Sequence, residues 1–308
     1  MAYHEKEYQK RLSLAQSKNA LITLISINLV LFVILAFIQA IYRLQYGAEA
    51  VSLFNEKVVK WFALSADYHQ ILARPWTIFT HMITHIDVWH IIGNMLWLWF
   101  FGYILHDLTG NRKIFPLFIY GGLAGALAFV LAYNFFPGLN ENVQVQTALG
   151  ASAGVMAIAA AVTTISPGFR IFPMLNGGIP IWIITVLYLI IDLANIPLSN
   201  PGGHIAHLAG ALTGFLFVYF FRRGHDWGQW MNTAYDWFNN LFNPEKPAKG
   251  KSVKQELFYR SSAKPFKKTP NVTAQRVDEI LDKINQRGYD SLSEEEKELL
   301  KRAANEDK

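Results

Sequence analysis

The amino-acid sequence predicts an all-α polytopic membrane protein: a bundle of six transmembrane helices with a membrane-embedded first loop and a small cytoplasmic helical tail. The chain has 308 residues, of which 52% are hydrophobic and 17% are charged, whereas a soluble domain carries about 25% charged residues. Six separate segments are apolar over roughly the 20 residues that a spanning helix needs. This composition excludes disordered, collagen-like and disulfide-scaffold chains. The absence of cysteine excludes cysteine proteases, zinc ribbons and iron–sulfur proteins.

The first predicted span runs from Ala20 to about Tyr42 and carries no charge before Arg43. A polar leader of 19 residues precedes it and no small-residue cleavage site follows, so we interpret it as a membrane helix rather than a signal peptide. Several later segments are short or contain glycine and histidine, which is typical of helices buried among others or beside a cavity. The five further predicted spans are about 90–106, 115–136, 149–166, 179–197 and 203–221.

The positive charges of the connections predict the orientation of the chain. The connections 137–148 and 198–202 contain no Lys or Arg, which is typical of loops on the outside. We therefore expect both termini to be cytoplasmic, in the cell (inner) membrane, and the first loop, 43–89, to lie outside. The basic residues of the other connections are Lys6, Lys10, Arg11, Lys18, Arg112, Lys113, Arg170, Arg222 and Arg223.

Amphipathic segments flank the predicted bundle. Residues 51–62 of the first loop have helical apolar spacing, which predicts a half-buried helix in the outer leaflet. After residue 223, aromatic residues at intervals of three and four predict an interfacial helix on the cytoplasmic face. Residues 223–269 hold nine Lys or Arg against four Asp or Glu, and this basic block suits a membrane surface rather than nucleic acid. The aromatic series is Trp227, Trp230, Trp237, Phe238 and Phe242.

A short helical hairpin is predicted at the end of the chain. Gly288 separates an apolar stripe from a second helix, and Ser293 with Glu296 forms a capping box. The predicted organisation is a cytoplasmic leader (1–19), a six-helix domain (20–222), an interfacial helix with a basic linker (223–271) and the hairpin (272–308). The apolar stripe consists of Val277, Ile280, Leu281 and Ile284.

The first candidate for chemistry is Ser152, in the sequence Leu149-Gly-Ala-Ser-Ala-Gly-Val155 at the start of the fourth predicted span. Small neighbours leave space around its hydroxyl, and a helix N-terminus offers free N–H groups to an oxyanion. A Gly-x-Ser-x-Gly motif in soluble hydrolases needs a strand–turn–helix context, and here an apolar helix follows. The alternative is a small-residue helix-packing patch whose hydroxyl bonds locally.

The sixth predicted span offers a base for this serine. Its histidine shares one helical face with small residues, so another helix can approach closely. The fourth span has a similarly slim face, and packing the two together would place an imidazole beside the hydroxyl. The alternative is a histidine that serves only packing. The two faces consist of His207, Gly210, Ala211 and Gly214 on the sixth span, and of Ser152, Met156, Ala159, Ala160 and Thr163 on the fourth.

Two more polar side chains begin the second predicted span. His90 and Asn94 are spaced i, i+4, so they share a helix face, and both can donate hydrogen bonds to a developing oxyanion. Upstream, His81 and His85 have the same spacing, and three histidines in ten residues raise the possibility of a metal. The zincin motif is absent and Asp87 is the nearby carboxylate. We therefore expect no metal, and loop-anchoring hydrogen bonds for His81 and His85.

Together these motifs resemble the rhomboid family of intramembrane serine proteases, in its bacterial type with a C-terminal helical extension. The similar stretch runs from residue 74 to about residue 214, and the six-span layout extends the resemblance to residues 20–222. The motifs fall in the same order on the second, fourth and sixth predicted spans. They are His90-x-x-x-Asn94, Gly150-x-Ser152 and Ala206-His207-x-x-Gly210.

The resemblance implies a Ser–His dyad without a carboxylate, with Ser152 as nucleophile and His207 as general base. His90 and Asn94, with the backbone N–H of Ser152, would bind the oxyanion, and no cofactor is needed. The dyad fits the absence of Asp or Glu near His207. Asp192 lies near the outer end of the fifth span, and we interpret it as an interfacial residue. Gly150, Met156 and Gly210 would support the site. The fifth span, which carries Trp182, Tyr188 and Asp192, would form a gate together with the loop 198–202.

Three positions depart from the family's usual pattern. Ala153 stands where glycine often follows the serine, Met156 where an aromatic often stacks on the histidine, and Trp76-Thr77 where Trp-Arg is common. The implied substrates are single-span or other membrane proteins in a lipid bilayer. The alternative is a catalytically inactive relative that binds membrane helices, and a transporter fits less well because no charged pathway is present. The C-terminal hairpin would recruit an unidentified partner or regulate access, or serve as a solvated tail.

Overall fold

The computed structural model describes residues 19–172, 177–241 and 274–306. The chain separates into two compact units, Met1–Phe242 and Asn243–Lys308. The first unit contains the helical bundle, and the second contains the C-terminal hairpin.

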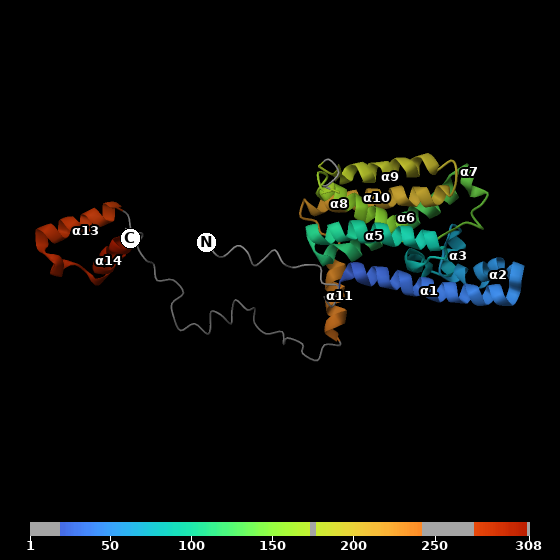
Figure 1. Cartoon of the computed structure of the whole chain (residues 1–308), viewed down its shortest axis with the longest axis horizontal. Helices are drawn as coiled ribbons and strands as arrows, with labels where there is room; N and C mark the ends of the chain where they lie inside the picture. Colours follow the sequence, from blue (N-terminus) through green and yellow to red (C-terminus); the bar gives the residue numbers. More distant parts are fainter. Residues whose placement is uncertain (1–18, 173–176, 242–273, 307–308) are drawn as a thin grey trace. The chain divides into compact units, whose positions relative to one another are not determined.

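All six predicted apolar segments form helices, and these run side by side in the first unit (Figure 1). The protein has the predicted all-α polytopic membrane fold. Within the described residues, four stretches are long and apolar enough to cross a bilayer, namely 20–61, 88–109, 111–135 and 201–221. Two helices are shorter, with 14 and 15 residues, so a total of six spans stays a prediction. The six helices are α1 (Ala20–Tyr46), α5 (Val88–Thr109), α6 (Ile114–Phe135), α8 (Ser152–Ile165), α9 (Ile181–Asn195) and α10 (Pro201–Phe221).

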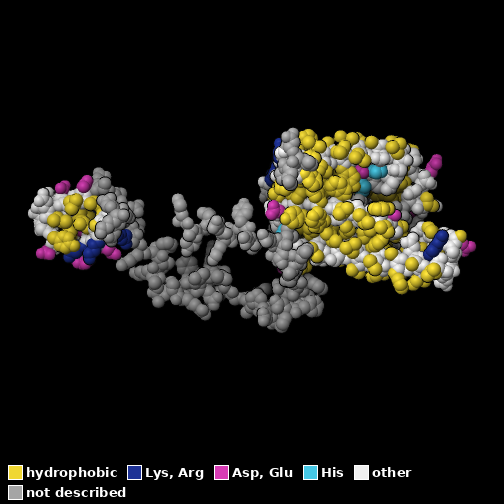
Figure 2. Space-filling model, viewed as in Figure 1, with side chains coloured by type: hydrophobic (Ala, Val, Ile, Leu, Met, Phe, Trp, Pro, Cys, Tyr) yellow, Lys and Arg dark blue, Asp and Glu magenta, His cyan; other side chains and the backbone are white. Residues whose placement is uncertain are grey.

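Helix α8 lies in the interior of the bundle, since its residues 153–162 are all buried. Alanine and glycine dominate this stretch, so neighbouring helices can pack directly against the α8 backbone. In contrast, α9 presents many large apolar side chains at its surface, and hydrophobic side chains cover much of the bundle in Figure 2. The exposed apolar residues of α9 are Trp182, Ile183, Val186, Leu187, Ile190, Ile191 and Leu193.

The first loop folds back onto the bundle. The predicted amphipathic helix forms as α2, and its Phe54 is buried together with Val59 against Leu35 of α1. The guanidinium of Arg74 donates to the carbonyl of Lys60, and this bond ties two parts of the loop together. The elements of this loop are η1 (Gly47–Glu49), α2 (Ala50–Lys57), η2 (Val59–Trp61), β1 (Leu64–Ser65), α3 (Tyr68–Ala73), α4 (Thr77–Thr80) and η3 (His81–Ile83).

Two short β-ribbons brace the ends of the helices. Strand β1 pairs antiparallel with β2 (Thr147–Ala148), with Leu64 opposite Ala148 and Ser65 opposite Thr147. This ribbon fixes the segment that leads into α8. A second antiparallel ribbon joins β3 (Arg170–Ile171) to β4 (Ile179–Pro180) between α8 and α9. The remaining elements between the helices are η4 (Asn111–Lys113) and α7 (Pro137–Asn140).

The aromatic segment after residue 223 forms α11 (Gln229–Leu241). Trp227 packs against Phe217 and Phe220 of α10, and the indole N–H of Trp230 donates to the Tyr120 hydroxyl over 2.6 Å. Trp230 and Trp237 are themselves exposed, as expected of a helix at a membrane surface. Phe242 lies outside the described residues.

The C-terminal unit is the predicted hairpin of α13 (Ala274–Arg287), η5 (Tyr289–Ser291) and α14 (Glu294–Glu306). The capping box is confirmed: the Glu296 carboxylate accepts from the Ser293 N–H over 2.8 Å, and the Ser293 hydroxyl accepts from the Glu296 N–H over 3.3 Å. Lys283 also forms a salt bridge with Glu296. This contact is the main reason that the pKa of Glu296 is lowered to about 2, and the hydrogen bonds with Ser293 lower it further. The predicted apolar stripe is wrong at Leu281, which is 48% exposed.

Candidate active site

Ser152 and His207 form a hydrogen-bonded pair. Ser152 is the first residue of α8 and His207 lies in the second turn of α10. The Ser152 Oγ lies 2.7 Å from the His207 Nε2, at the ordinary distance of a hydrogen bond to a hydroxyl. The two side chains come from positions 55 residues apart, so the packing of α8 on α10 creates the contact.

Gly210 allows α10 to approach α8 this closely. A Cβ atom at residue 210 would lie 2.2 Å from the carbonyl oxygen of Ala153, far inside van der Waals contact. Gly214 has the same relation to Ala157, at 2.0 Å. The glycine face of α10 therefore rests on the Ala153–Ala157 ridge of α8 rather than on the predicted face, although Met156 and Ala160 do pack with Ala211.

Backbone geometry and two histidines hold the turn before Ser152. Gly150 has a φ of +119°, which favours glycine, and its N–H donates to the carbonyl of His81 over 2.8 Å. The Ala151 N–H donates to the Nε2 of His85 over 3.3 Å. Burial lowers the pKa of His81 to about 4 and, together with the charge of His90, that of His85 to about 3. Both rings are therefore neutral near pH 7, and the loop-anchoring role predicted for them is confirmed.

A cavity of about 520 Å³ opens beside the Ser152–His207 pair. His90 lines this cavity, and its ring lies against Gly150, where a Cβ would come within 2.8 Å of its Nε2. Asn94 is buried and does not line the cavity, because its side-chain amide donates back to the His90 carbonyl over 2.9 Å. Other parts of the wall come from Gly125, Tyr133, Gln146, Thr147, Ala148, Leu149, Asn200, Pro201 and Gly203.

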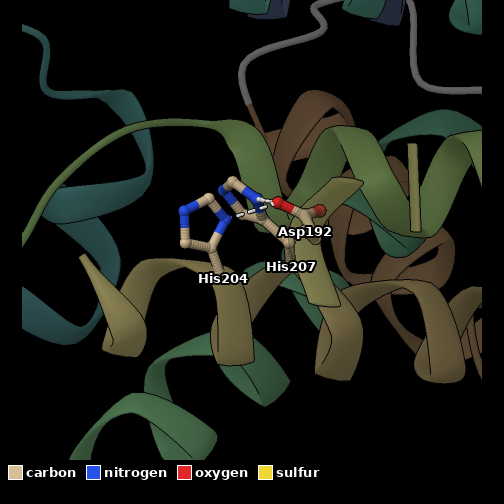
Figure 3. Close-up of side chains that lie close together, drawn as sticks. All are labelled: Asp192, His204 and His207. Carbon is tan, nitrogen blue, oxygen red and sulfur yellow. Dashed lines mark hydrogen bonds and ion pairs between the residues drawn. The ribbon is translucent and has the colours of Figure 1, made fainter. Parts of the chain in front are cut away.

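The expectation of no carboxylate near His207 is wrong. Asp192 of α9 is 1% exposed, and its Oδ1 lies 2.9 Å from the Nδ1 of His207 and 2.7 Å from the Nδ1 of His204 (Figure 3). The interfacial interpretation of Asp192 fails for the same reason, since the side chain points into the bundle. The sequence did carry a signal, because Asp192 is the single acidic residue of residues 142–225 and lies in an apolar segment.

An aromatic ring from α9 also packs on the histidine. The Tyr188 ring meets the His207 ring edge-on with centroids 6.3 Å apart, and it also contacts Trp97 of α5. Met156 is buried in a cluster with Tyr188. Tyr188 therefore makes the aromatic contact with the His207 ring that the family's usual pattern would place at the position of Met156.

Asp192, His204 and His207 are also the group of potential metal ligands found among the described residues, with ligand atoms within 4.8 Å of one another. Their contacts are those of hydrogen bonds, because both imidazole Nδ1 atoms approach the same carboxylate oxygen. A zinc ion would instead sit about 2.0 Å from each nitrogen. His81, His85 and His90 do not form such a group.

Comparisons with known proteins identify the family of the chain. A protein-family model, described as the rhomboid domain, matches residues 72–224. This stretch includes Ser152, His207 and the cavity wall. The chain belongs to the rhomboid family. A second model, for a family of unknown function (DUF6576), matches residues 269–306, the C-terminal hairpin.

Three rhomboid proteins are among the curated relatives, each at low identity. Rhomboid protein 1, mitochondrial, of Saccharomyces cerevisiae is 28% identical over 52% of this chain and 45% of its own length. The rhomboid protease GlpG of Pectobacterium atrosepticum is 24% identical over 28% of this chain and 37% of its own. RHOMBOID-like protein 12, mitochondrial, of Arabidopsis thaliana is 25% identical over 52% and 50%. The chain thus spans half or less of the length of these rhomboid relatives.

Proposed function

We propose that this protein is an intramembrane serine endopeptidase that cleaves transmembrane or juxtamembrane segments of other membrane proteins. The observation that carries the proposal is the 2.7 Å contact between Ser152 Oγ and His207 Nε2 at the wall of a cavity inside the helical bundle. A serine hydroxyl is a weak nucleophile until an adjacent base accepts its proton. The Ser–His contact supplies that base within a family that includes a protein named as a protease.

The proposed reaction begins when the Ser152 hydroxyl attacks the scissile carbonyl carbon and passes its proton to the Nε2 of His207. The resulting oxyanion accepts hydrogen bonds from the Ser152 N–H, which is free at the first turn of α8, and from His90 at the cavity wall. His207 then gives its proton to the leaving amine, and an acyl-enzyme remains on Ser152. Water, deprotonated by His207, hydrolyses the ester and restores the hydroxyl.

A substrate helix must unwind before this attack, because its carbonyls are engaged in backbone hydrogen bonds. Glycine and proline weaken a helix by roughly 1 to 3 kcal/mol each, so we expect cleavage near such residues at the outer end of the substrate span. Helix α9, whose outer surface is apolar, would be the gate through which a lipid-embedded substrate reaches the cavity.

The proposed topology follows from the charges of the connections. Six spans place both termini in the cytoplasm and the cavity near the outer face of the cell (inner) membrane. The protease domain would comprise residues 20–222, after a cytoplasmic leader (1–19), with 223–271 as interfacial helix and linker. The hairpin, 272–308, would bind a cytoplasmic partner.

A serine-reactive fluorophosphonate probe tests the proposal. The purified protein in detergent is expected to be labelled, and labelling is expected to disappear in Ser152→Ala and in His207→Ala. The same two variants should fail to cleave a generic single-span substrate. Folded wild-type protein that neither labels nor cleaves would contradict the proposal and would favour an inactive binder of membrane helices.

A further inference from the structure

A buried carboxylate lies behind the proposed general base. Asp192 of α9 is 1% exposed, and one of its oxygens accepts hydrogen bonds from the Nδ1 atoms of His204 and His207 (Figure 3). The opposite edge of the His207 ring faces Ser152. The three side chains Asp192, His207 and Ser152 therefore form one continuous hydrogen-bonded chain across α9, α10 and α8.

Helix docking alone does not require a charged group at this position. Helix α9 is already tied to α8 by two neutral hydroxyls, Thr185 and Thr163, whose oxygens lie 2.6 Å apart. A carboxylate within a lipid-embedded bundle is far more costly than a hydroxyl. The second oxygen of Asp192, Oδ2, is buried without a hydrogen-bond partner, so the side chain is not fully satisfied as a structural tie. Helix docking therefore does not explain the negative charge of Asp192.

We propose that Asp192 is a positioning residue that holds His207 in the form that can accept the Ser152 proton. This inference rests on the proposed protease function. A carboxylate can only accept hydrogen bonds, so the Nδ1 of His207 must carry the ring hydrogen. The Nε2 then presents its lone pair to the hydroxyl of Ser152, as a general base requires.

The same carboxylate stabilises the ring after proton transfer. When His207 takes the proton from Ser152, the imidazolium keeps its Nδ1–H on Asp192, and the positive charge forms 2.9 Å from a negative oxygen. Charge-assisted hydrogen bonds of this kind are roughly twice as strong as neutral ones. No proton moves to Asp192 in this scheme.

His204 fixes the carboxylate independently of the reacting ring. It lies one turn before His207 on α10 and donates to the same Oδ1 over 2.7 Å. Asp192 is therefore held in place by His204 even while His207 exchanges protons. Because the carboxylate comes from α9 and both rings come from α10, His207 is correctly held only when these two helices are docked.

The test compares substitutions at Asp192 with a matched change on the same helix. Asp192→Ala removes the acceptor, whereas Asp192→Asn keeps the size of the side chain, removes its charge and replaces one acceptor oxygen by an NH2 donor. Thr185→Val removes the hydrogen bond between the Thr185 and Thr163 hydroxyls and leaves Asp192 unchanged. Ser152→Ala tests the protease function itself. Each full-length variant is assayed in proteoliposomes for kcat and KM on a single-span substrate, with thermal unfolding as the folding check.

We expect Asp192→Ala to lower kcat by about 10²- to 10⁴-fold with KM within about threefold, the upper figure being the loss found when the buried aspartate of a soluble Ser–His–Asp protease is replaced. Asp192→Asn should also lose about 10²- to 10⁴-fold, because the asparagine amide can donate to the Nδ1 of His207 and so favour the wrong tautomer. Thr185→Val should stay within about threefold of the wild type. Histidine ¹⁵N spectra should show an Nδ1–H tautomer for His207, assigned by its absence from His207→Gln, and Asp192→Ala should lose it.

Four results would overturn the inference. These are an Asp192→Ala variant with kcat within about threefold of the wild type, a change in KM instead of kcat, an equal loss in Thr185→Val, and an unchanged His207 tautomer. If Asp192→Ala does not fold, Asp192→Asn decides, because activity equal to the wild type in that variant excludes a role for the charge. Cleavage that survives Ser152→Ala would refute the protease function itself, whereas an inactive Ser152→Ala beside a fully active Asp192→Ala would refute the positioning role alone.

Discussion

Substituting alanine for Gly210 should separate the two reacting side chains. The added Cβ would lie 2.2 Å from the Ala153 carbonyl oxygen, and ordinary contact begins at 3.4 Å, so α10 must retreat from α8 by about 1.2 Å. His207 is one turn away on α10, and Ser152 is the neighbour of Ala153. A rigid displacement of that size would lengthen their 2.7 Å contact to about 3.9 Å, which is no longer a hydrogen bond.

The expected consequence is a loss of about 10²-fold in kcat, the effect of a misplacement near 1 Å in an active site. Fluorophosphonate labelling rates and cleavage of a single-span substrate measure it. Gly138→Ala is the matched control, because a Cβ at that position meets nothing within 4 Å. A folded Gly210→Ala protein that reacts at the wild-type rate would refute the argument that close approach at Gly210 sets the Ser–His geometry.

Further predictions concern the walls and supports of the site. His90→Ala should lower kcat by about 10²- to 10³-fold, because an oxyanion donor is lost. Asn94→Ala should lower kcat less, because the Asn94 amide already donates to the His90 carbonyl. A larger loss of kcat in Asn94→Ala than in His90→Ala would contradict this reasoning. Gly125→Ala should lower the melting temperature, since its Cβ would lie 2.5 Å from the Cβ of Ala153, and adding Ala153→Gly should restore much of the loss. Because burial lowers the pKa of His85 to about 3, its contribution to stability is complete above pH 6.5 and falls by about 1.4 kcal/mol per pH unit as the pH drops toward 3. Acid unfolding curves of His85→Gln should lose this slope and keep the one from His81, whose pKa burial lowers to about 4.

The helices were largely predictable from the sequence because apolar runs of about 20 residues have few alternative structures. Every predicted span has a helix at its position, and the capping box of Ser293 and Glu296 forms as expected. Local signals of this kind depend on residues close in the sequence. Leu281 shows their limit: it fits the helical spacing of the stripe, yet the hairpin core is closed by Leu292 and Leu299 instead.

The contact of Ser152 with His207 was predictable because small residues mark where two helices can meet. The rotation of each helix about its own axis could not be predicted from the sequence. The glycines of α10 meet the Ala153–Ala157 ridge, about one residue around from the expected face. Helical spacing also did not distinguish His90 from Asn94: the two share a face of α5, but of the two only His90 lines the cavity.

Asp192 was misinterpreted because its position in the sequence resembles that of a residue at a helix end. Its partners lie on a different helix, and nothing in the spacing of α9 alone identifies them. A pattern was nevertheless present, since the buried residues of α9 are Ile181, Thr185 and Asp192, which lie on one side of the helix. Two polar residues on the buried side of an apolar helix indicate hydrogen-bond partners inside the bundle.

The lengths of α8 and α9 explain how polar groups reach the inside of an apolar bundle. With 14 and 15 residues, each is about 21 to 23 Å long at 1.5 Å per residue, short of the roughly 30 Å hydrocarbon core. Helix α10, with 21 residues, reaches about 32 Å. Ser152 begins one short helix and Asp192 lies near the end of the other, so the shortfall at these ends leaves room for a cavity. A full-length helix in place of α8 would fill that space with its own backbone and would leave the Ser152 hydroxyl, which lines the cavity, without access to water.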